Sequence, residues 1–285
     1  MATSIFSTLS AKLQAFYDRF PLYETQDSTS RHLIAAPSKP VLWIAPRLRS
    51  DTTSYDWVSS DPSSLRFQLL FLLAGVDAEW KEWETESTAP EGKLPTLVLP
   101  EKIVPASEVR AWLDAEHPLY DIKSDFHGYP NATLEAQARA FGRLATDKIY
   151  PAYMASLASS QTSVARLALL LPNPPTLLGG LTSPLPSLGQ LKRVDLESIK
   201  REGAEAIRAL GVRLVADGTG PDDWFLGCST PTPLDCLVVS HLFLILHTLP
   251  TSNPLRRAID ADEPLKRYVE RFFQKVDPSS SSSST

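Results

Sequence analysis

An almost wholly apolar helix in the C-terminal third of the chain is the feature that most constrains its fold. The segment Thr232-Pro-Leu-Asp235 has the spacing of a capping box, with Thr232 as N-cap and Pro233 in the first helical position. The apolar run from Leu234 to Leu249 contains Asp235 and two histidines and is too short to cross a bilayer. A helix that is apolar on every side must be covered on every side, so we expect it at the centre of a helical domain.

The first part of the chain alternates between strands and helices. Asp61 is placed to cap a helix that has Pro62 in its first position and Gly75 at its end. That helix is apolar nearly all round, so we expect it to be covered on both sides, as between a sheet and a second domain. The elements around it are a buried strand at 40–46, a weak strand at 79–85, a strand after Pro95, a short strand at 103–104 and a helix at 108–114.

From about residue 130 onward, only helical patterns follow. We expect helices at 133–159 with a kink or break at Pro151, at 195–214, at 233–249, and a last amphipathic helix that ends near Val276. The fold class is therefore α/β plus all-α. The expected regions are an N-terminal helix and linker at 1–38, an α/β domain at 39–118, a helical domain at 128–277 with a Pro-rich insertion at 172–190, and a disordered serine tail at 278–285.

An amphipathic segment precedes the α/β domain. Its apolar residues lie within one arc at helical spacing and include Ile5, Phe6, Leu9, Leu13, Phe16 and Phe20. We expect this helix to dock on a partner or at a membrane interface, since an isolated helix of this length is marginal in water. Two alternatives remain open at this point: the helix folds back onto the globular body, or it is a cleaved mitochondrial presequence.

Charge and motif content exclude several classes of function. A net charge of −5 argues against a basic nucleic-acid-binding face. Cys228 and Cys236 have no zinc spacing, and His241 and His247 are six residues apart, so we expect no metal site. The basic residues of the last helix are read either as a solvated face or as a contact with anionic headgroups; they are Lys266, Arg267, Arg271 and Lys275.

Three segments together resemble the glutathione-transferase fold, in which a thioredoxin-like domain packs on an all-α domain. They are Gly92-Lys-Leu-Pro95-Thr-Leu, then Ala106-Ser107-Glu108-Val109, and Phe225 to Asp235. The resemblance implies that Pro95 is cis and that Ser107 opens a helix towards glutathione. It also implies that a thiolate-stabilising group lies near the end of the first strand.

Other segments resemble the metaxins more closely. They are Pro231 to Leu242, Leu249-Pro250, and Leu265 to Phe273, together with Trp43 and a Leu-rich helix that ends in Leu-Ala-Gly75. Metaxins are subunits of the mitochondrial sorting and assembly machinery, which inserts β-barrel proteins into the outer membrane. With no anchor segment, the chain looks like the smaller metaxin-type subunit on the cytosolic face, and the insertion at 172–190 suggests a fungal type. The implied partners are the barrel-forming subunit, a second metaxin-type subunit and the β-barrel precursor, with peripheral membrane contact.

The expected glutathione site is weak in this sequence. The loop at 46–60 offers only hydroxyl groups, those of Ser50, Ser54, Tyr55 and Ser59, and the expected pocket rim is acidic. We therefore expect Pro95 and Ser107 to be vestigial, with Ser107 acting as a helix cap. The sequence thus predicts a protein that is not an enzyme and has no cofactor. The alternative is a glutathione transferase that acts on small electrophiles.

Overall fold

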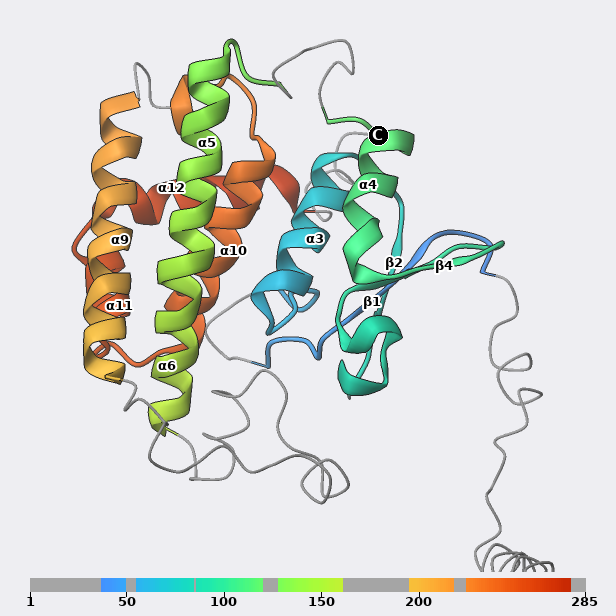
Figure 1. The fold of residues 1–285 in the computed structure, drawn as a ribbon, viewed down its shortest axis with the longest axis horizontal. Helices are drawn as coiled ribbons and strands as arrows, with labels where there is room; N and C mark the ends of the chain where they lie inside the picture. Colours follow the sequence, from blue (N-terminus) through green and yellow to red (C-terminus); the bar gives the residue numbers. More distant parts are fainter. Residues whose placement is uncertain are drawn as a thin grey trace, which may run out of the picture.

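The computed structural model describes residues 37–49, 55–84, 86–119, 128–160, 195–217 and 224–277. The predicted N-terminal helix at 5–20, the insertion at 172–190 and the serine tail at 278–285 lie outside the described residues. The described elements form a small sheet domain beside a set of helices (Figure 1). This arrangement confirms the predicted α/β plus all-α fold class.

A four-stranded sheet forms the first domain. Its strands are β1 (Val41–Ile44), β2 (Glu79–Glu82), β3 (Thr96–Val98) and β4 (Ile103–Val104), in the spatial order β2-β1-β3-β4. β1 pairs parallel with β2, whereas the β1–β3 and β3–β4 pairs are antiparallel. Two 3₁₀ turns, η1 (Glu86–Thr88) and η2 (Pro90–Gly92), precede β3, and the Leu94–Pro95 peptide bond is cis as predicted.

Helix α3 (Pro62–Leu73) lies between the sheet domain and the helical domain (Figure 1). The Asp61 side chain accepts a hydrogen bond from the Ser64 backbone N–H at 2.8 Å, and Pro62 occupies the first turn. The chain leaves the helix through Gly75 in the left-handed region at φ +68°, a conformation that glycine adopts at little cost. Leu65, Leu69 and Phe71 are fully buried, so the prediction of a helix covered on both sides is confirmed.

The helical domain surrounds α10 (Pro233–Thr248), which is buried from Leu234 to Ile245. The other elements of this domain are α5 (Ala132–Leu144), the π-helical turn η3 (Ala145–Ile149), α6 (Tyr150–Ser160), α9 (Leu196–Asp217), the 3₁₀ turn η5 (Phe225–Gly227), α11 (Pro254–Asp260) and α12 (Glu263–Val276). Of these, α5, η3, α11 and α12 pack against α10, and α9 packs against α6 and α11. The helix that begins at Ala132 continues through Pro151, and the widened π turn directly precedes this residue, whose nitrogen cannot donate a hydrogen bond.

Two local predictions need correction. Ser107 is not the cap of α4 (Ala106–Glu116): the helix starts two residues earlier than expected, with Pro105 in the N-cap position and no side-chain cap. The sequence reading also missed α11, although Asn253 caps it and Pro254 occupies its first turn. Both cases follow from backbone chemistry, because a proline fixes an extended residue before the first helical turn. Within the described ranges, no helix is long and apolar enough to cross a membrane.

Candidate functional site

The end of β1 is where the resemblance to glutathione transferases implies a thiolate-stabilising group. In this chain the side chains nearest that strand end bond to its backbone instead. The Ser59 hydroxyl donates to the Ala45 carbonyl at 3.0 Å, and the Ala45 N–H donates to the Ser64 hydroxyl at 3.2 Å. Both serines are fully buried. The Ser59 hydroxyl therefore holds the loop, and the Ser64 hydroxyl the first turn of α3, against the end of the strand.

The second implied position comprises cis-Pro95 and Ser107. Ser107 lies exposed in the first turn of α4, and its hydroxyl donates to a carboxylate oxygen of Glu91 at 3.0 Å. The Leu94 N–H, just before Pro95, faces a Glu86 carboxylate oxygen at 3.4 Å. Two carboxylates thus lie against this position, which agrees with the acidic rim read from the sequence. Among the loop hydroxyls, Ser50 and Ser54 lie outside the described residues.

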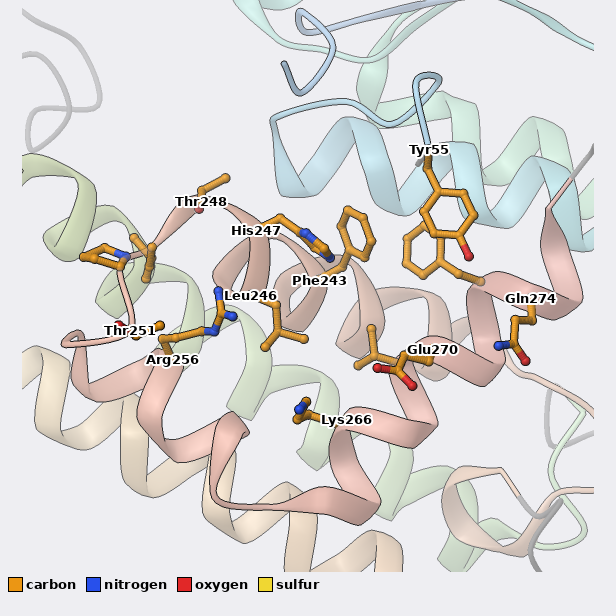
Figure 2. Close-up of a pocket in the computed structure, with 14 residues that line it drawn as sticks. Tyr55, Phe243, Leu246, His247, Thr248, Thr251, Arg256, Lys266, Glu270 and Gln274 are labelled. Atoms are coloured by element: carbon orange, nitrogen blue, oxygen red, sulfur yellow. The ribbon is translucent and has the colours of Figure 1, made fainter. Parts of the chain in front are cut away.

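Tyr55, the remaining loop hydroxyl, lies in a different pocket (Figure 2). This pocket of about 730 Å³ is bounded by the last turns of α10, by α11, by α12 and by the loop that carries Tyr55. Its base is aromatic: Phe243 stacks on Phe273 with ring centroids 4.1 Å apart, and Tyr55 lies 4.9 Å from Phe273. His247 lies 4.2 Å from Phe243. We call it the α10–α12 pocket.

Three charged side chains line the α10–α12 pocket: Arg256, Lys266 and Glu270. In Figure 2 the Glu270 carboxylate lies between Lys266 and Gln274, and the Tyr55 hydroxyl lies on the same side of the pocket as Gln274. Burial raises the pKa of Tyr55, and Asp277 and Glu270 raise it further. Burial lowers the pKa of His247, and Arg256 lowers it further, so His247 is neutral near pH 7. The pocket therefore suits a ligand with an apolar body and polar ends.

Sequence reasoning missed the α10–α12 pocket. Its residues come from three helices and one distant loop, and no spacing within a single element joins them. The available signal was Lys266, which the sequence reading assigned to a solvated or headgroup-facing surface. In the structure Lys266 is half-buried and lines the pocket. Arg271 and Lys275, from the same group, lie over the Trp224 ring at 4.5 and 5.8 Å.

The most buried charged group of the described chain is Asp235, at the start of α10. It is fully buried and accepts four hydrogen bonds: from the Phe225 N–H at 3.2 Å, the Thr232 N–H and hydroxyl at 2.6 Å each, and the Tyr268 hydroxyl at 2.6 Å. The predicted capping box is therefore confirmed, and it is extended by residues far away in the sequence. With its acceptors filled by the protein itself, Asp235 holds η5, α10 and α12 together.

No metal centre is visible in the part of the chain that the structure describes: no three His, Cys, Asp or Glu side chains group there. Cys228 and Cys236 are both buried free thiols. Burial raises the pKa of the Cys236 thiol, with Asp235 adding to the effect, so this group stays protonated and is a poor nucleophile.

Comparison with known proteins shows which fold this chain shares. The family model "Glutathione S-transferase, C-terminal domain" matches residues 203–272, which run from α9 into α12. A glutathione transferase family member from Pseudomonas fluorescens, solved with two glutathione molecules bound, aligns with a TM-score of 0.54 at 12% identity over 86% of this chain and 93% of that one. The chain has the glutathione-transferase fold. A glutathione S-transferase from Methylobacterium radiotolerans, in complex with glutathione sulfonate, aligns with a TM-score of 0.52 at 16% identity and the same coverage. No curated protein sequence matches the chain significantly.

These comparisons correct one prediction. The sequence reading expected a protein that is not an enzyme, whereas the solved proteins that share its glutathione-transferase fold are enzymes. The error arose because the reading placed its weight on the acidic rim and on the missing cysteine. At identities of 12 and 16% the similarity establishes the fold, and the residues that would act are specific to this chain.

Proposed function

We propose that this chain is a peripheral subunit of the machinery that sorts and assembles β-barrel proteins in the mitochondrial outer membrane. In this role it lies on the cytosolic face and helps to recognise and insert β-barrel precursors. Its partners are the barrel-forming subunit and a second metaxin-type subunit.

One observation carries the proposal: two of the segments that resemble metaxins line the α10–α12 pocket. Leu249-Pro250 forms part of its wall, and Lys266, Val269 and Phe273 come from the resembling stretch of α12. These segments are separated in the sequence and meet only in the folded chain. An open pocket with an aromatic base and charged side chains in its lining suits an extended polypeptide that inserts an apolar side chain.

Native purification tests the proposal. Extraction of the tagged full-length chain in mild detergent should recover a barrel-forming membrane protein, identified by mass spectrometry. Leu246→Arg, in the half-buried wall of the pocket, should reduce recovery of newly imported β-barrel precursor. Val212→Arg is the matched control, because Val212 is an apolar residue on α9 that is 71% exposed and lies outside the pocket. Absence of any barrel protein from the complex would overturn the proposal.

The N-terminal segment is a second proposed contact of the same complex. Its apolar face, Ile5, Phe6, Leu9, Leu13, Phe16 and Phe20, lies outside the described residues and is assigned to partner or membrane contact on sequence grounds alone. Serine at Leu9, Leu13 and Phe16 together should release the chain from membranes without changing its thermal melting. A triple variant that stays bound but melts at lower temperature would place the helix within the folded body instead.

A glutathione transferase acting on small electrophiles is the second candidate function. The observation in its favour is local: Pro95 is cis, as the glutathione-transferase resemblance implies, and Ser107 is exposed in the first turn of α4. Retention on immobilised glutathione and turnover of a standard electrophile test it. Ser107→Ala should then reduce turnover, whereas Ser198→Ala, on α9, should not. A wild-type rate equal to that of the heat-killed protein would remove this candidate.

A further inference from the structure

The wall of the α10–α12 pocket offers a ligand more surface than its base does. Phe243, Val269 and Phe273 are almost fully buried, so they present little surface to the pocket. Leu246 and Lys266 are half-buried and line the pocket around them (Figure 2). The volume of about 730 Å³ is within the range of ligand pockets in proteins. The wall therefore sets the chemistry that a ligand meets.

The charges of this wall are balanced unequally by the protein. Arg256 donates to the Asp260 carboxylate at 3.0 Å, one turn further along α11. The Lys266 side chain has no hydrogen-bonding or ion-pair partner within the described ranges, and its ammonium group is not fully covered. Lys266 is therefore a cation that a ligand in the pocket can reach and that the described protein leaves without an acceptor.

Glu270 lies one turn after Lys266 on α12 but forms no ion pair with it. Glu263 and Arg267 have the same spacing on the same helix and lie 3.7 Å apart. Their order, with the acidic residue first, is the favourable one in a helix, whereas Lys266 and Glu270 have the reverse order. Lys266 is half-buried and Glu270 is exposed. The lysine is thus the less solvated of the two charges and gains more from a partner.

We infer that Lys266 selects polypeptides that have an acidic side chain two residues before or after the apolar residue that enters the pocket. The inference rests on the function proposed above, in which the pocket receives an apolar side chain of a β-barrel precursor. In an extended chain, residues two positions apart point to the same side and lie about 7 Å apart. A carboxylate at that position faces the pocket, and the Lys266 ammonium donates to it.

Other side chains at the same position fit the wall less well. A neutral amide accepts a hydrogen bond from Lys266 but leaves its charge unbalanced. A basic side chain meets a like charge on Lys266, and the opposite charge that the described wall offers it is Glu270, which is exposed to water. The expected order of affinity is acidic, then neutral, then basic.

Fluorescence anisotropy with short labelled peptides tests the inference on the full-length chain. One peptide has a central leucine with glutamate two residues before and two residues after it, in a background of serine and threonine. Two others have glutamine or lysine in place of both glutamates. The glutamate peptide should bind about tenfold more tightly than the glutamine peptide, as one hydrogen bond between charged groups allows, and the lysine peptide should bind most weakly. Equal binding of the three peptides, or no binding of any, would overturn the inference.

Variants of α12 locate the selectivity. Lys266→Gln should remove the preference for glutamate, and Lys266→Glu should reverse it in favour of the lysine peptide. Glu270→Gln removes a like charge near the expected carboxylate, so the glutamate peptide should bind more tightly to this variant. Arg267→Gln is the matched control and should keep the wild-type preference, because Arg267 is the adjacent exposed cation and lies outside the pocket.

Circular dichroism shows whether each variant is folded. A folded Lys266→Gln variant that still prefers the glutamate peptide would contradict the assignment, as would an equal loss of preference in Arg267→Gln. Glu270→Gln changes an exposed side chain and gives an independent test if either Lys266 variant folds poorly. Unchanged or weaker binding of the glutamate peptide to Glu270→Gln would then count against a carboxylate near Lys266.

The purification described above fails or succeeds separately from this test. A barrel-forming protein that co-purifies, together with equal binding of the glutamate and glutamine peptides, would keep the proposed function and overturn the selectivity of Lys266. A preference for the glutamate peptide without any barrel-forming protein in the complex would support the selectivity and overturn the proposed function.

Discussion

Asp235 is a fully buried acidic residue and Arg66 a half-buried basic one, and their surroundings are opposite. Asp235 accepts four hydrogen bonds from η5, α10 and α12, with none longer than 3.2 Å. Arg66, on α3, has a fully covered Nε and no hydrogen-bonding partner in the described ranges. The hydrogen-bonding capacity of the first group is filled by the protein, whereas the covered Nε of the second is left without a partner. A buried charge whose partners are all present has a structural role, and an unsatisfied donor is a local cost to stability.

The largest expected effect is at Asp235. Replacing it by alanine leaves the Phe225 N–H, the Thr232 N–H and the Tyr268 hydroxyl buried without an acceptor, so we expect the free energy of unfolding to fall by about 3–5 kcal/mol. Urea denaturation measures this loss in the free energy of unfolding. Asp195→Ala is the control, because Asp195 caps α9 at an exposed position and a cap contributes about 1 kcal/mol. Equal losses of stability in the two variants would mean that the buried hydrogen bonds of Asp235 stabilise the fold no more than an ordinary helix cap does.

His241 extends the comparison to an ionisable group that stays neutral. Burial, with a smaller contribution from Arg66, lowers its pKa to about 4, although the hydrogen bond between its Nδ1 and the Leu237 carbonyl, 2.8 Å long, opposes the shift. The unfolded chain takes up this proton near pH 6.5 and the folded one only near pH 4, so stability is complete above about pH 6.5 and falls as the pH drops. The loss reaches about 3 kcal/mol near pH 4.

Denaturation curves measured between pH 7 and about pH 4 check this dependence. His241→Leu should flatten the curve, whereas the same change at exposed His117 should leave it as in the wild type. A His241→Leu variant with the wild-type pH dependence would show that other groups cause the acid sensitivity.

A smaller effect is expected at Tyr268. Its hydroxyl donates to Asp235 at 2.6 Å, and burial raises the pKa of Tyr268 far above the ordinary value. Tyr268→Phe removes one of four hydrogen bonds and keeps the ring, so unfolding should require about 1–2 kcal/mol less. Thermal or urea unfolding measures the change, with Tyr150→Phe as the control, since that partly exposed tyrosine makes no contact with Asp235. A neutral Tyr268→Phe variant would show that three partners suffice for Asp235.

The smallest effect is expected at Arg66, and this variant tests the contrast with Asp235 most directly. Arg66→Met replaces a half-buried charge, whose covered Nε has no partner, by an apolar side chain of similar length. Stability should be unchanged or increase by about 1 kcal/mol, because no hydrogen bond within the described residues is lost. Urea denaturation measures the change in the free energy of unfolding. A loss as large as that of Asp235→Ala would reveal a structural role for Arg66 and end the contrast.

Local patterns in the sequence predicted several elements correctly. The Asp61-Pro62 start of α3, its Gly75 end and the Thr232–Asp235 capping box involve residues within a few positions of each other. Ser107 was assigned wrongly because Pro105 had already ended the extended segment, so the helix began one residue before the expected cap. The start of α11 at Asn253-Pro254 has the same kind of local cap-and-proline pattern, so this helix could have been predicted from the sequence.

The sequence by itself determined the helix ends and the buried faces, because hydrogen bonds within one turn and the spacing of apolar side chains depend only on neighbouring residues. Tertiary structure alone decided which distant groups meet. Tyr268 reaches Asp235 across 33 positions, and Tyr129 lies 3.5 Å from the Thr232 hydroxyl across 103. Arg66 and Asp114 share a cleft although each lies on a different helix. Whether a buried charge finds its partner is therefore settled by how helices pack, and no local pattern of residues records that packing.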